Sequence, residues 1–88
     1  MNPRLLKLKY RAWHRGFREA DLVLGPFADG HLASLSAGEL DAFEALLEEP
    51  DPDLWAWIIG QAPAPESVHA GLLERIRAFS LRAREPGR

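Results

Sequence analysis

Cysteine is absent from this chain of 88 residues, which excludes disulfide bonds, thiolate metal sites and a cysteine nucleophile. Hydrophobic runs are short: none approaches the ~20 apolar residues that a membrane-spanning helix needs, and no signal-peptide core follows Met1. We therefore expect a cytoplasmic protein that inserts no segment into a membrane. A glycine fingerprint for dinucleotides is also missing, and the chain is too short for a conventional Rossmann unit.

Residues that favour β-strands are scarce as well. The β-branched aliphatic residues are Val23, Ile58, Ile59, Val68 and Ile76. No stretch alternates apolar and polar residues with a period of two, whereas helical spacing recurs throughout. The sequence therefore predicts an all-α fold, a small antiparallel five-helix bundle forming a single domain over residues 1–88. A basic tail from about residue 82 is expected to fray.

Charge is segregated along the chain, although the net charge is only −2. Residues 1–18 hold six Lys and Arg and no acid, residues 19–66 hold eleven Asp and Glu and no Lys or Arg, and residues 67–88 hold five Arg and two Glu. The basic first segment fits a nucleic-acid or membrane-surface patch. The alternative, which we favour, is that basic and acidic helices lie side by side and partly neutralise each other.

The first two helices are predicted from apolar spacing. The first begins after Pro3, and one stripe of it consists of Leu6, Tyr10, Trp13 and Phe17. Gly16 is predicted to end this helix in a left-handed or tight turn. One face of the second helix consists of Ala20, Val23, Leu24 and Phe27. Gly25-Pro26 should bend or end it, because Pro26 has no amide proton to donate.

The later helices have clearer boundaries. Ser36 and Glu39 are spaced as a capping box at the start of the third helix. Its expected buried residues are Leu40, Phe43, Leu46 and Leu47. Asp51-Pro52 is predicted to supply the N-cap and first residue of a fourth helix that runs to Gly60. The fifth helix is defined by Leu72, Ile76 and Phe79.

Side chains with catalytic or metal-binding chemistry are scattered. The three histidines, His14, His31 and His69, lie on different segments without the spacing of a zinc site. No serine has a nucleophile-elbow context and no glycine loop is suited to phosphate. We therefore expect a binding protein rather than an enzyme, with no metal and no catalytic residue.

Two segments need a separate explanation. Trp55 and Trp57 are two residues apart, so on a helix they point away from each other. We assign Trp57 to the core and expect Trp55 to be partly exposed, either at an interface or folded over a neighbouring loop. Arg15 and Glu19 lie at the boundary between the basic and acidic segments. They suit a surface ion pair beside a capping glycine.

These segments together resemble the SdhE family of flavinylation factors, bacterial relatives of the mitochondrial succinate dehydrogenase assembly factors. The residues that carry the resemblance are Arg15-Gly16-x-x-Glu19, Asp21, Gly25-Pro26-Phe27, Leu35-Ser36, Phe43, Leu46-Leu47-Glu48 and Asp51-Pro52-Asp53-Leu54-Trp55-x-Trp57. The resemblance covers roughly residues 4–79. Two positions depart from it: His14 stands where many members have Arg, and Trp55 where Phe or Tyr is usual.

The resemblance implies a helical assembly factor that binds the apo-flavoprotein subunit of succinate dehydrogenase, and that of fumarate reductase where present. It would promote covalent attachment of FAD to a histidine of that subunit, as a monomer without a tightly bound cofactor of its own. The implied docking residues are Arg15, Gly16, Phe17, Arg18 and Glu19, and in a secondary role His14, Asp21 and Trp55. In this role no nucleic acid is bound.

Two other classes of function stay open at this point. One is a small antitoxin-like or nucleic-acid-binding regulator that uses the basic N-terminal helix, although its second helix would be acidic, unlike most recognition helices. The other is a small enzyme.

Overall fold

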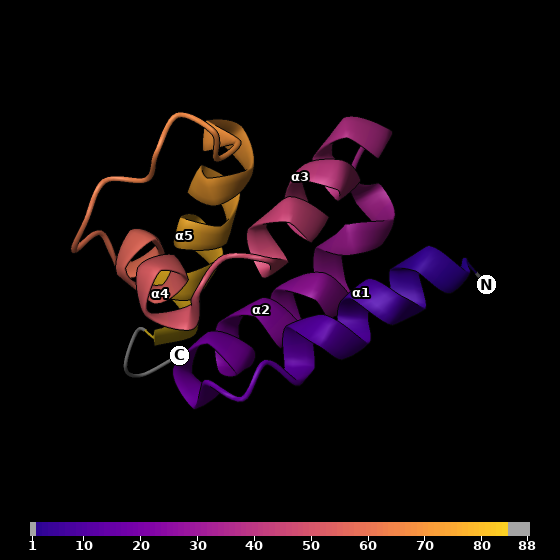
Figure 1. Cartoon of the computed structure of the whole chain (residues 1–88). Helices are drawn as coiled ribbons and strands as arrows, with labels where there is room; N and C mark the ends of the chain where they lie inside the picture. The colour runs from indigo at the N-terminus through magenta and orange to yellow at the C-terminus, as the bar shows by residue number, and fades with distance from the viewer. Residues whose placement is uncertain (1, 85–88) are drawn as a thin grey trace.

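The computed structural model describes residues 2–84 as five α-helices and one short 3-10 turn (Figure 1). The elements are α1 (Pro3–Trp13), α2 (Arg18–His31), η1 (Leu32–Ser34), α3 (Ala37–Leu47), α4 (Asp51–Ile59) and α5 (Ala70–Arg84). No strand occurs among these residues, so the predicted all-α fold is confirmed. Within the tail that was expected to fray, α5 continues to Arg84, and residues 85–88 lie outside the described part of the chain.

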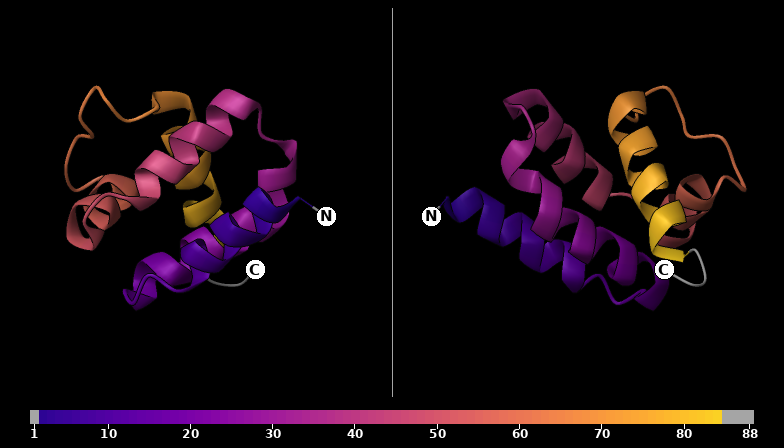
Figure 2. Two further views of the ribbon diagram at one scale, coloured as in Figure 1. Left: turned by 45° about the vertical axis from the view of Figure 1, so that its right-hand side comes forward. Right: turned by 180° about the vertical axis from the view of Figure 1, so that it is seen from behind.

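α2 lies at the centre of the hydrophobic core, because it contacts α1, α4 and α5. Figure 2 shows α1 and α2 running side by side. The predicted face of α2 is buried, and its members are Ala20, Val23, Leu24 and Phe27. The Phe27 ring stacks near Phe43 of α3, with centroids 6.1 Å apart, and meets Phe79 of α5 edge-on at 5.7 Å. One aromatic cluster therefore joins three helices.

The predicted stripe of α1 is not its buried face. Leu6 and Tyr10 are 49% and 57% exposed, whereas Leu8 and Ala12 are buried and Leu5 packs partly against the core. Arg4 and Arg11 occupy a third side of α1, apart from both the buried side and the exposed apolar side. With Leu8 and Ala12 against the core and the arginines on the side towards α3, Leu6 and Tyr10 face solvent.

Trp13, the last stripe residue within α1, lies against α2. Its indole occupies the space that a Cβ at Gly25 would enter, and its Nε1 donates to Asp29 (3.1 Å). Of the two outcomes predicted at Gly25-Pro26, a bend or an end of the helix, the end is wrong, since α2 continues to His31. Proline removes one helical hydrogen bond at a cost of about 3 kcal/mol, but the core residues on both sides of it keep the segment helical.

The junctions around α3 and α4 follow the predicted signals, with one correction. Ser36 Oγ accepts from the Glu39 amide (3.1 Å) and the Glu39 carboxylate accepts from the Ser36 amide (2.9 Å), so the capping box is confirmed. Gly60 ends α4 with a φ of +79°. Asp51, however, is not the N-cap: Pro50 holds that position and Asp51 is the first helical residue. Its carboxylate binds an arginine instead.

Basic side chains of α1 pair with acidic side chains of α3 and its C-cap, which confirms that basic and acidic helices lie side by side and partly neutralise each other. Arg4 binds Asp41 (2.6 Å) and Glu44 (3.2 Å), and Arg11 binds Glu48. Pairs at the surface contribute only about 0–1 kcal/mol each. Their main consequence is orientation, because they hold one side of α1 towards α3.

Candidate partner-binding site

The turn between α1 and α2, residues 14–17, holds the start of the Arg-Gly-x-x-Glu motif. Gly16 has the left-handed conformation that the sequence predicts, with a φ of +89°, but it does not end α1, whose last residue is Trp13 and whose C-cap is His14. A Cβ at Gly16 would meet no atom within 4 Å. Asp21 fixes the turn from α2: its amide donates to the Phe17 carbonyl (2.9 Å), and its Oδ1 accepts from the Arg15 amide (3.1 Å). The main chain of the turn is therefore held in place while Gly16 stays open to solvent.

The Arg15 side chain points inwards, and only 9% of it is exposed. Its Nε donates to Asp51 Oδ1 (2.7 Å). Nη1 donates to the Leu47 carbonyl, and Nη2 donates to the Glu49 carbonyl (2.7 Å). The ion pair that the spacing suggested with Glu19 is not formed, because these three acceptors bind the guanidinium instead.

Phe17 is the N-cap of α2 and packs towards α4. Its ring centroid lies 6.3 Å from that of Trp55, and both side chains are half-buried against the core. Trp57 is buried, as predicted. Trp55 is partly exposed and covers the turn. The Arg15–Asp51 and Phe17–Trp55 contacts thus bring together the two sequence blocks that carry the family resemblance.

The outer side of the motif is unengaged. Gly16, Arg18 and Glu19 are exposed, and within residues 2–84 no side-chain hydrogen bond or ion pair engages Arg18 or Glu19. Glu19 lies in the first turn of α2, where the helix dipole favours its negative charge. We name Gly16, Phe17, Arg18 and Glu19 the turn surface. It offers a main chain without a Cβ, an aromatic edge, a cation and an anion.

The three secondary candidates have internal contacts. His14 is exposed, but its Nδ1 lies 2.8 Å from the Tyr10 carbonyl and its ring packs on Tyr10, with centroids 4.1 Å apart. Asp21 holds the main chain of the turn, and Trp55 supports Phe17. Asp21 and Trp55 therefore support the turn surface from the inner side, and His14 is adjacent to it in the sequence.

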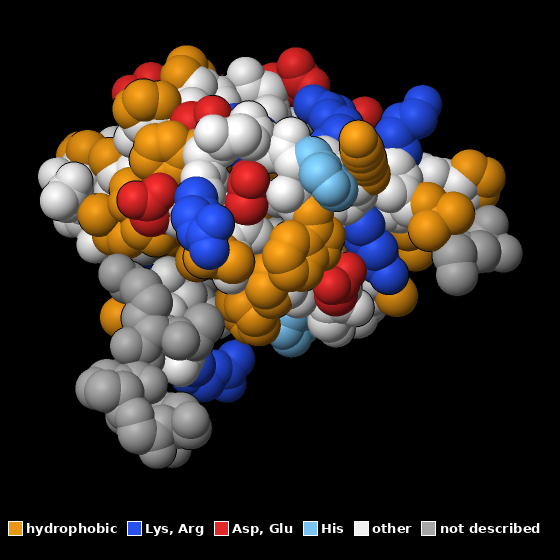
Figure 3. Space-filling view, turned by 90° about the horizontal axis from the view of Figure 1, so that it is seen from below, with side chains coloured by type: hydrophobic (Ala, Val, Ile, Leu, Met, Phe, Trp, Pro, Cys, Tyr) orange, Lys and Arg blue, Asp and Glu red, His pale blue; other side chains and the backbone are white. Residues whose placement is uncertain are grey.

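An exposed apolar face adjoins the turn surface on α1 and α2. Four of the five large hydrophobic side chains exposed among residues 2–84 belong to these helices: Leu6, Tyr10, Trp13 and Leu22. Figure 3 views the molecule from below, the side on which α1 and α2 lie in Figure 1, and shows apolar side chains gathered among basic ones and histidine. The spacing of the α1 stripe can be read from the sequence, but the exposure of these side chains cannot.

Sequence reasoning missed the acceptors of Arg15. The sequence predicted Asp51 as the cap of the fourth helix and Leu47 as a buried residue of the third, and it gave no role to the Glu49 carbonyl. Every residue has a main-chain carbonyl, so the sequence does not show which carbonyls accept a hydrogen bond from a side chain. The one signal available was that the motif beginning at Arg15 and the block beginning at Asp51 occur together.

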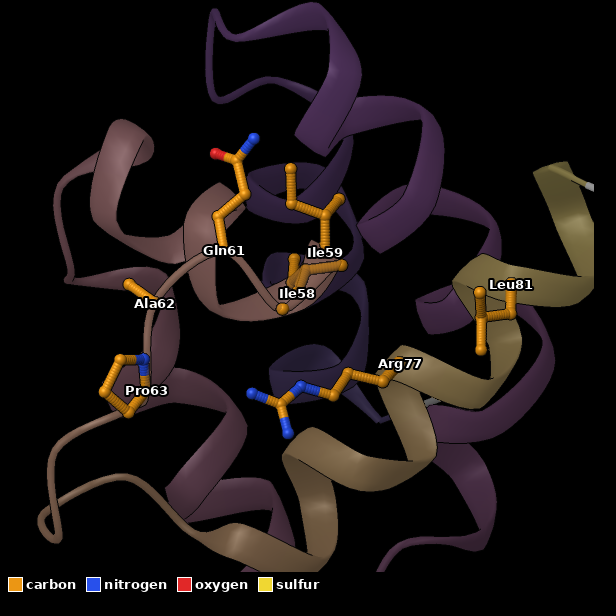
Figure 4. Close-up of a pocket in the computed structure, with 8 residues that line it drawn as sticks. Ile58, Ile59, Gln61, Ala62, Pro63, Arg77 and Leu81 are labelled. Carbon is orange, nitrogen blue, oxygen red and sulfur yellow. The ribbon is translucent and has the colours of Figure 1, made fainter.

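Within residues 2–84, no group of three His, Asp or Glu side chains is placed to hold a metal ion. None of the helices there has the length and hydropathy of a membrane-spanning segment. Figure 4 shows a hollow at the C-terminal end of α4, bordered by Gln61, Pro63 and Arg77. The Arg77 Nε donates to the Trp57 carbonyl (2.8 Å) and its Nη1 to Glu74 (2.8 Å). Arg77 thus ties α5 to the end of α4.

Comparison with known proteins gives the family. A family model described as flavinator of succinate dehydrogenase matches residues 6–80. A FAD assembly factor SdhE of Acetobacter pasteurianus is 40% identical over 70 residues, which cover 80% of this chain and 64% of the relative. One of Haemophilus ducreyi is 41% identical over 64 residues, covering 73% and 78%.

Mitochondrial relatives match as well. Succinate dehydrogenase assembly factor 2 of Dictyostelium discoideum is 37% identical over 71 residues, covering 81% of this chain and 50% of the relative. This chain thus spans 64% and 50% of the lengths of the Acetobacter and Dictyostelium proteins. Because the matched region includes the turn surface, α4 and most of α5, the chain belongs to the succinate dehydrogenase flavinator family.

Proposed function

We propose that this protein binds the flavoprotein subunit of succinate dehydrogenase and promotes covalent attachment of FAD to that subunit. Membership of the flavinator family and the names of its relatives support this role. The structural observation that carries it is the turn surface: Gly16 and Glu19 are open to a partner, while Arg15 fixes the turn from within. We extend the proposal to the flavoprotein subunit of fumarate reductase.

Binding is sufficient for such a role. Covalent attachment requires the acceptor histidine of the partner to be aligned with the flavin. A protein that binds the aligned conformation of the apo-subunit more tightly than other conformations raises its population. FAD is then a substrate held by the partner. We propose that this chain has no flavin of its own, contributes no catalytic residue and acts as a monomer.

Each residue of the turn surface has a separate task in the proposed contact. Gly16 lets the partner's main chain approach closely, since no Cβ intervenes. Glu19 accepts charge-assisted hydrogen bonds from partner donors, and Arg18 donates them. Phe17 supplies apolar area that Trp55 holds in place. Because the turn is already fixed, little ordering is left to oppose binding.

The proposed function is tested by reconstitution from purified apo-flavoprotein subunit and FAD, with covalent flavin read as in-gel fluorescence. We expect the protein to raise the yield, and Glu19→Gln to lower the effect about tenfold through a lost charge-assisted hydrogen bond. The matched control is Asp53→Asn, an exposed acid in the first turn of α4, which should act as wild type. Equal yields with and without the wild-type protein would refute the proposal.

The structure disfavours the nucleic-acid alternative. Three of the N-terminal arginines are engaged by acids of this chain: Arg4, Arg11 and Arg15. Their charge is largely compensated before any phosphate could bind. We propose that no nucleic acid is a partner, and a mobility-shift assay at physiological salt should show no sequence-dependent complex.

A further inference from the structure

Arg15 belongs to the motif implied in docking, yet a partner could scarcely reach it. Its side chain is 9% exposed, and its guanidinium donates to three acceptors that lie 32 to 36 residues further along the chain. A group bound in this way can turn to a partner only by leaving its own buried acceptors unpaired.

We infer that Arg15 is a positioning residue: it sets the place of the turn surface by tying the α1–α2 turn to the start of α4, and does not itself contact the partner. This inference rests on the proposed function, because it assigns how one residue of the motif serves that function. The motif then divides into an inner anchor, Arg15, and the outer turn surface.

The acceptors explain why the anchor is an arginine. The Leu47 carbonyl belongs to the last residue of α3, where helix carbonyls lack intrahelical partners and the helix dipole is negative, and the Glu49 carbonyl follows two residues later. Asp51 adds a full negative charge at the first residue of α4. A planar guanidinium reaches all three with separate nitrogens, whereas the single nitrogen of a lysine cannot span them.

The anchor acts on the turn surface by two short routes. The Arg15 amide is bound by Asp21, whose own amide donates to the Phe17 carbonyl, so the main chain of the turn is fixed on the α2 side. The Phe17 ring lies on Trp55 of α4, the helix whose start Arg15 holds. Releasing the guanidinium therefore loosens the start of α4 and the turn together.

Arg77 provides a matched control within the same chain. It too donates to a main-chain carbonyl of α4, that of Trp57, and has an acidic partner, Glu74. It does so at the opposite end of the helix. Arg77→Gln therefore removes a similar tie without touching the turn surface, and separates a loss of stability from a loss of position.

The experiment compares Arg15→Gln, Arg15→Lys and Arg77→Gln with the wild type, at a temperature where circular dichroism shows all four to be folded. Amide hydrogen exchange is followed at Arg15 and Asp21, the two amides that hold the turn. Affinity for the purified apo-flavoprotein subunit is measured by titration calorimetry. We expect Arg15→Gln to speed exchange and weaken binding, each about tenfold, Arg15→Lys to fall between, and Arg77→Gln to leave both unchanged.

The outcomes are distinct. Weaker binding by Arg15→Gln with unchanged exchange in the turn would mean that Arg15 contacts the partner directly, and would overturn the inference alone. So would faster exchange with undiminished affinity, or an equal loss of affinity in Arg77→Gln. Failure of the wild-type protein to bind the subunit would refute the proposed function, and the inference with it.

Discussion

An arginine from another part of the chain ties each end of α4. At the N-terminal end, Arg15 of the α1–α2 turn donates to Asp51, the first residue of α4, and to two main-chain carbonyls that precede the helix. At the C-terminal end, Arg77 of α5 donates to the Trp57 carbonyl. A left-handed glycine lies near each tie in the sequence: Gly16 follows Arg15 in the turn (φ +89°), and Gly60 ends α4 (φ +79°).

The surroundings of the two ends differ, and this difference supports the proposal that the docking site lies at the N-terminal end. Arginine ties and positive-φ glycines stabilise loops in many proteins, so neither is diagnostic. Beside the N-terminal end, Arg18 and Glu19 have no side-chain partner within residues 2–84. At the other end, the arginine has its acid, Glu74, on its own helix. Gly60 and Arg77 therefore serve as controls for substitutions of Gly16 and Arg15.

The largest effect is expected from Gly16→Arg set against Gly60→Arg. Both glycines have a positive φ and no atom near an added Cβ, so each substitution should cost about 1–2 kcal/mol of unfolding free energy through backbone strain. Only Gly16→Arg should abolish covalent flavin on the succinate dehydrogenase flavoprotein, because its side chain blocks the partner. The measurement is in-gel flavin fluorescence in a strain lacking its native factor.

Gly16→Ala completes that comparison. It has the same backbone strain with a small side chain, so flavin incorporation should lie between wild type and Gly16→Arg. If a stably folded Gly16→Arg protein supported wild-type incorporation, the docking role of Gly16 would be lost and only its conformational role would remain.

The next effect concerns stability. Arg15→Ala removes a nearly buried guanidinium and leaves a carboxylate and two carbonyls unpaired, which should cost about 2–4 kcal/mol. Arg77→Ala removes two hydrogen bonds from a side chain that is 32% exposed, and should cost about 1–2 kcal/mol. Urea unfolding followed by circular dichroism gives both values. A larger loss of unfolding free energy for Arg77→Ala than for Arg15→Ala would contradict the expectation that the Arg15 contacts stabilise the fold more.

A smaller effect is expected from the ring contact that supports the turn. A double-mutant cycle with Phe17→Leu and Trp55→Leu should give a coupling of about 0.5–1.5 kcal/mol, because the rings pack on each other. Tyr10→Leu with Trp55→Leu is the control, since Tyr10 packs on His14 instead, and should show none. Equal coupling in both cycles would mean that the Phe17–Trp55 contact has no special strength.

The smallest effect is a pH dependence far from the docking site. The hydrogen bond from the Ser36 amide lowers the pKa of Glu39 below its ordinary value. The carboxylate therefore stabilises the fold above its unfolded pKa, and that stabilisation is lost as the pH falls through the lowered, folded value. The difference in unfolding free energy between wild type and Glu39→Gln should shrink from about pH 6 to about pH 3. If the difference in unfolding free energy did not change with pH, the capping box would not be the cause of the lowered pKa of Glu39.

Features that depend on residues close in sequence were predicted correctly, and features that depend on contacts between distant residues were not. The capping box at Ser36 and the left-handed turn at Gly16 are local, and the sequence predicted both. At Gly25-Pro26 the sequence predicted a bend or an end of the helix, and the end was wrong because tertiary packing outweighed a local penalty. The buried face of α1 was wrongly predicted because it depends on how α1 packs against α2, and no pattern within Leu6 to Trp13 contains that information.

The candidate site divides in the same way. The turn-surface residues were selected from the motif, and their docking role stays a prediction; Gly16, Arg18 and Glu19 are exposed, whereas Phe17 is half-buried. The inward course of Arg15 could not be predicted, because two of its acceptors are main-chain carbonyls, which every residue has. Asp51 could have been paired with Arg15 only by knowing that α4 begins beside the turn.

The long separation between Arg15 and its acceptors has a consequence for synthesis of the chain. Residues 14–19 emerge from the ribosome early, but the groups that hold Arg15 are not complete until Asp51 has emerged. Such distant contacts form late, because a long loop must close first. Pulse-labelled exchange during refolding should protect the Arg15 and Asp21 amides no earlier than α4. A nascent or truncated chain would contain the residues of the motif without the folded conformation of the turn. Under the proposed function, the flavoprotein subunit would therefore bind only the fully folded chain.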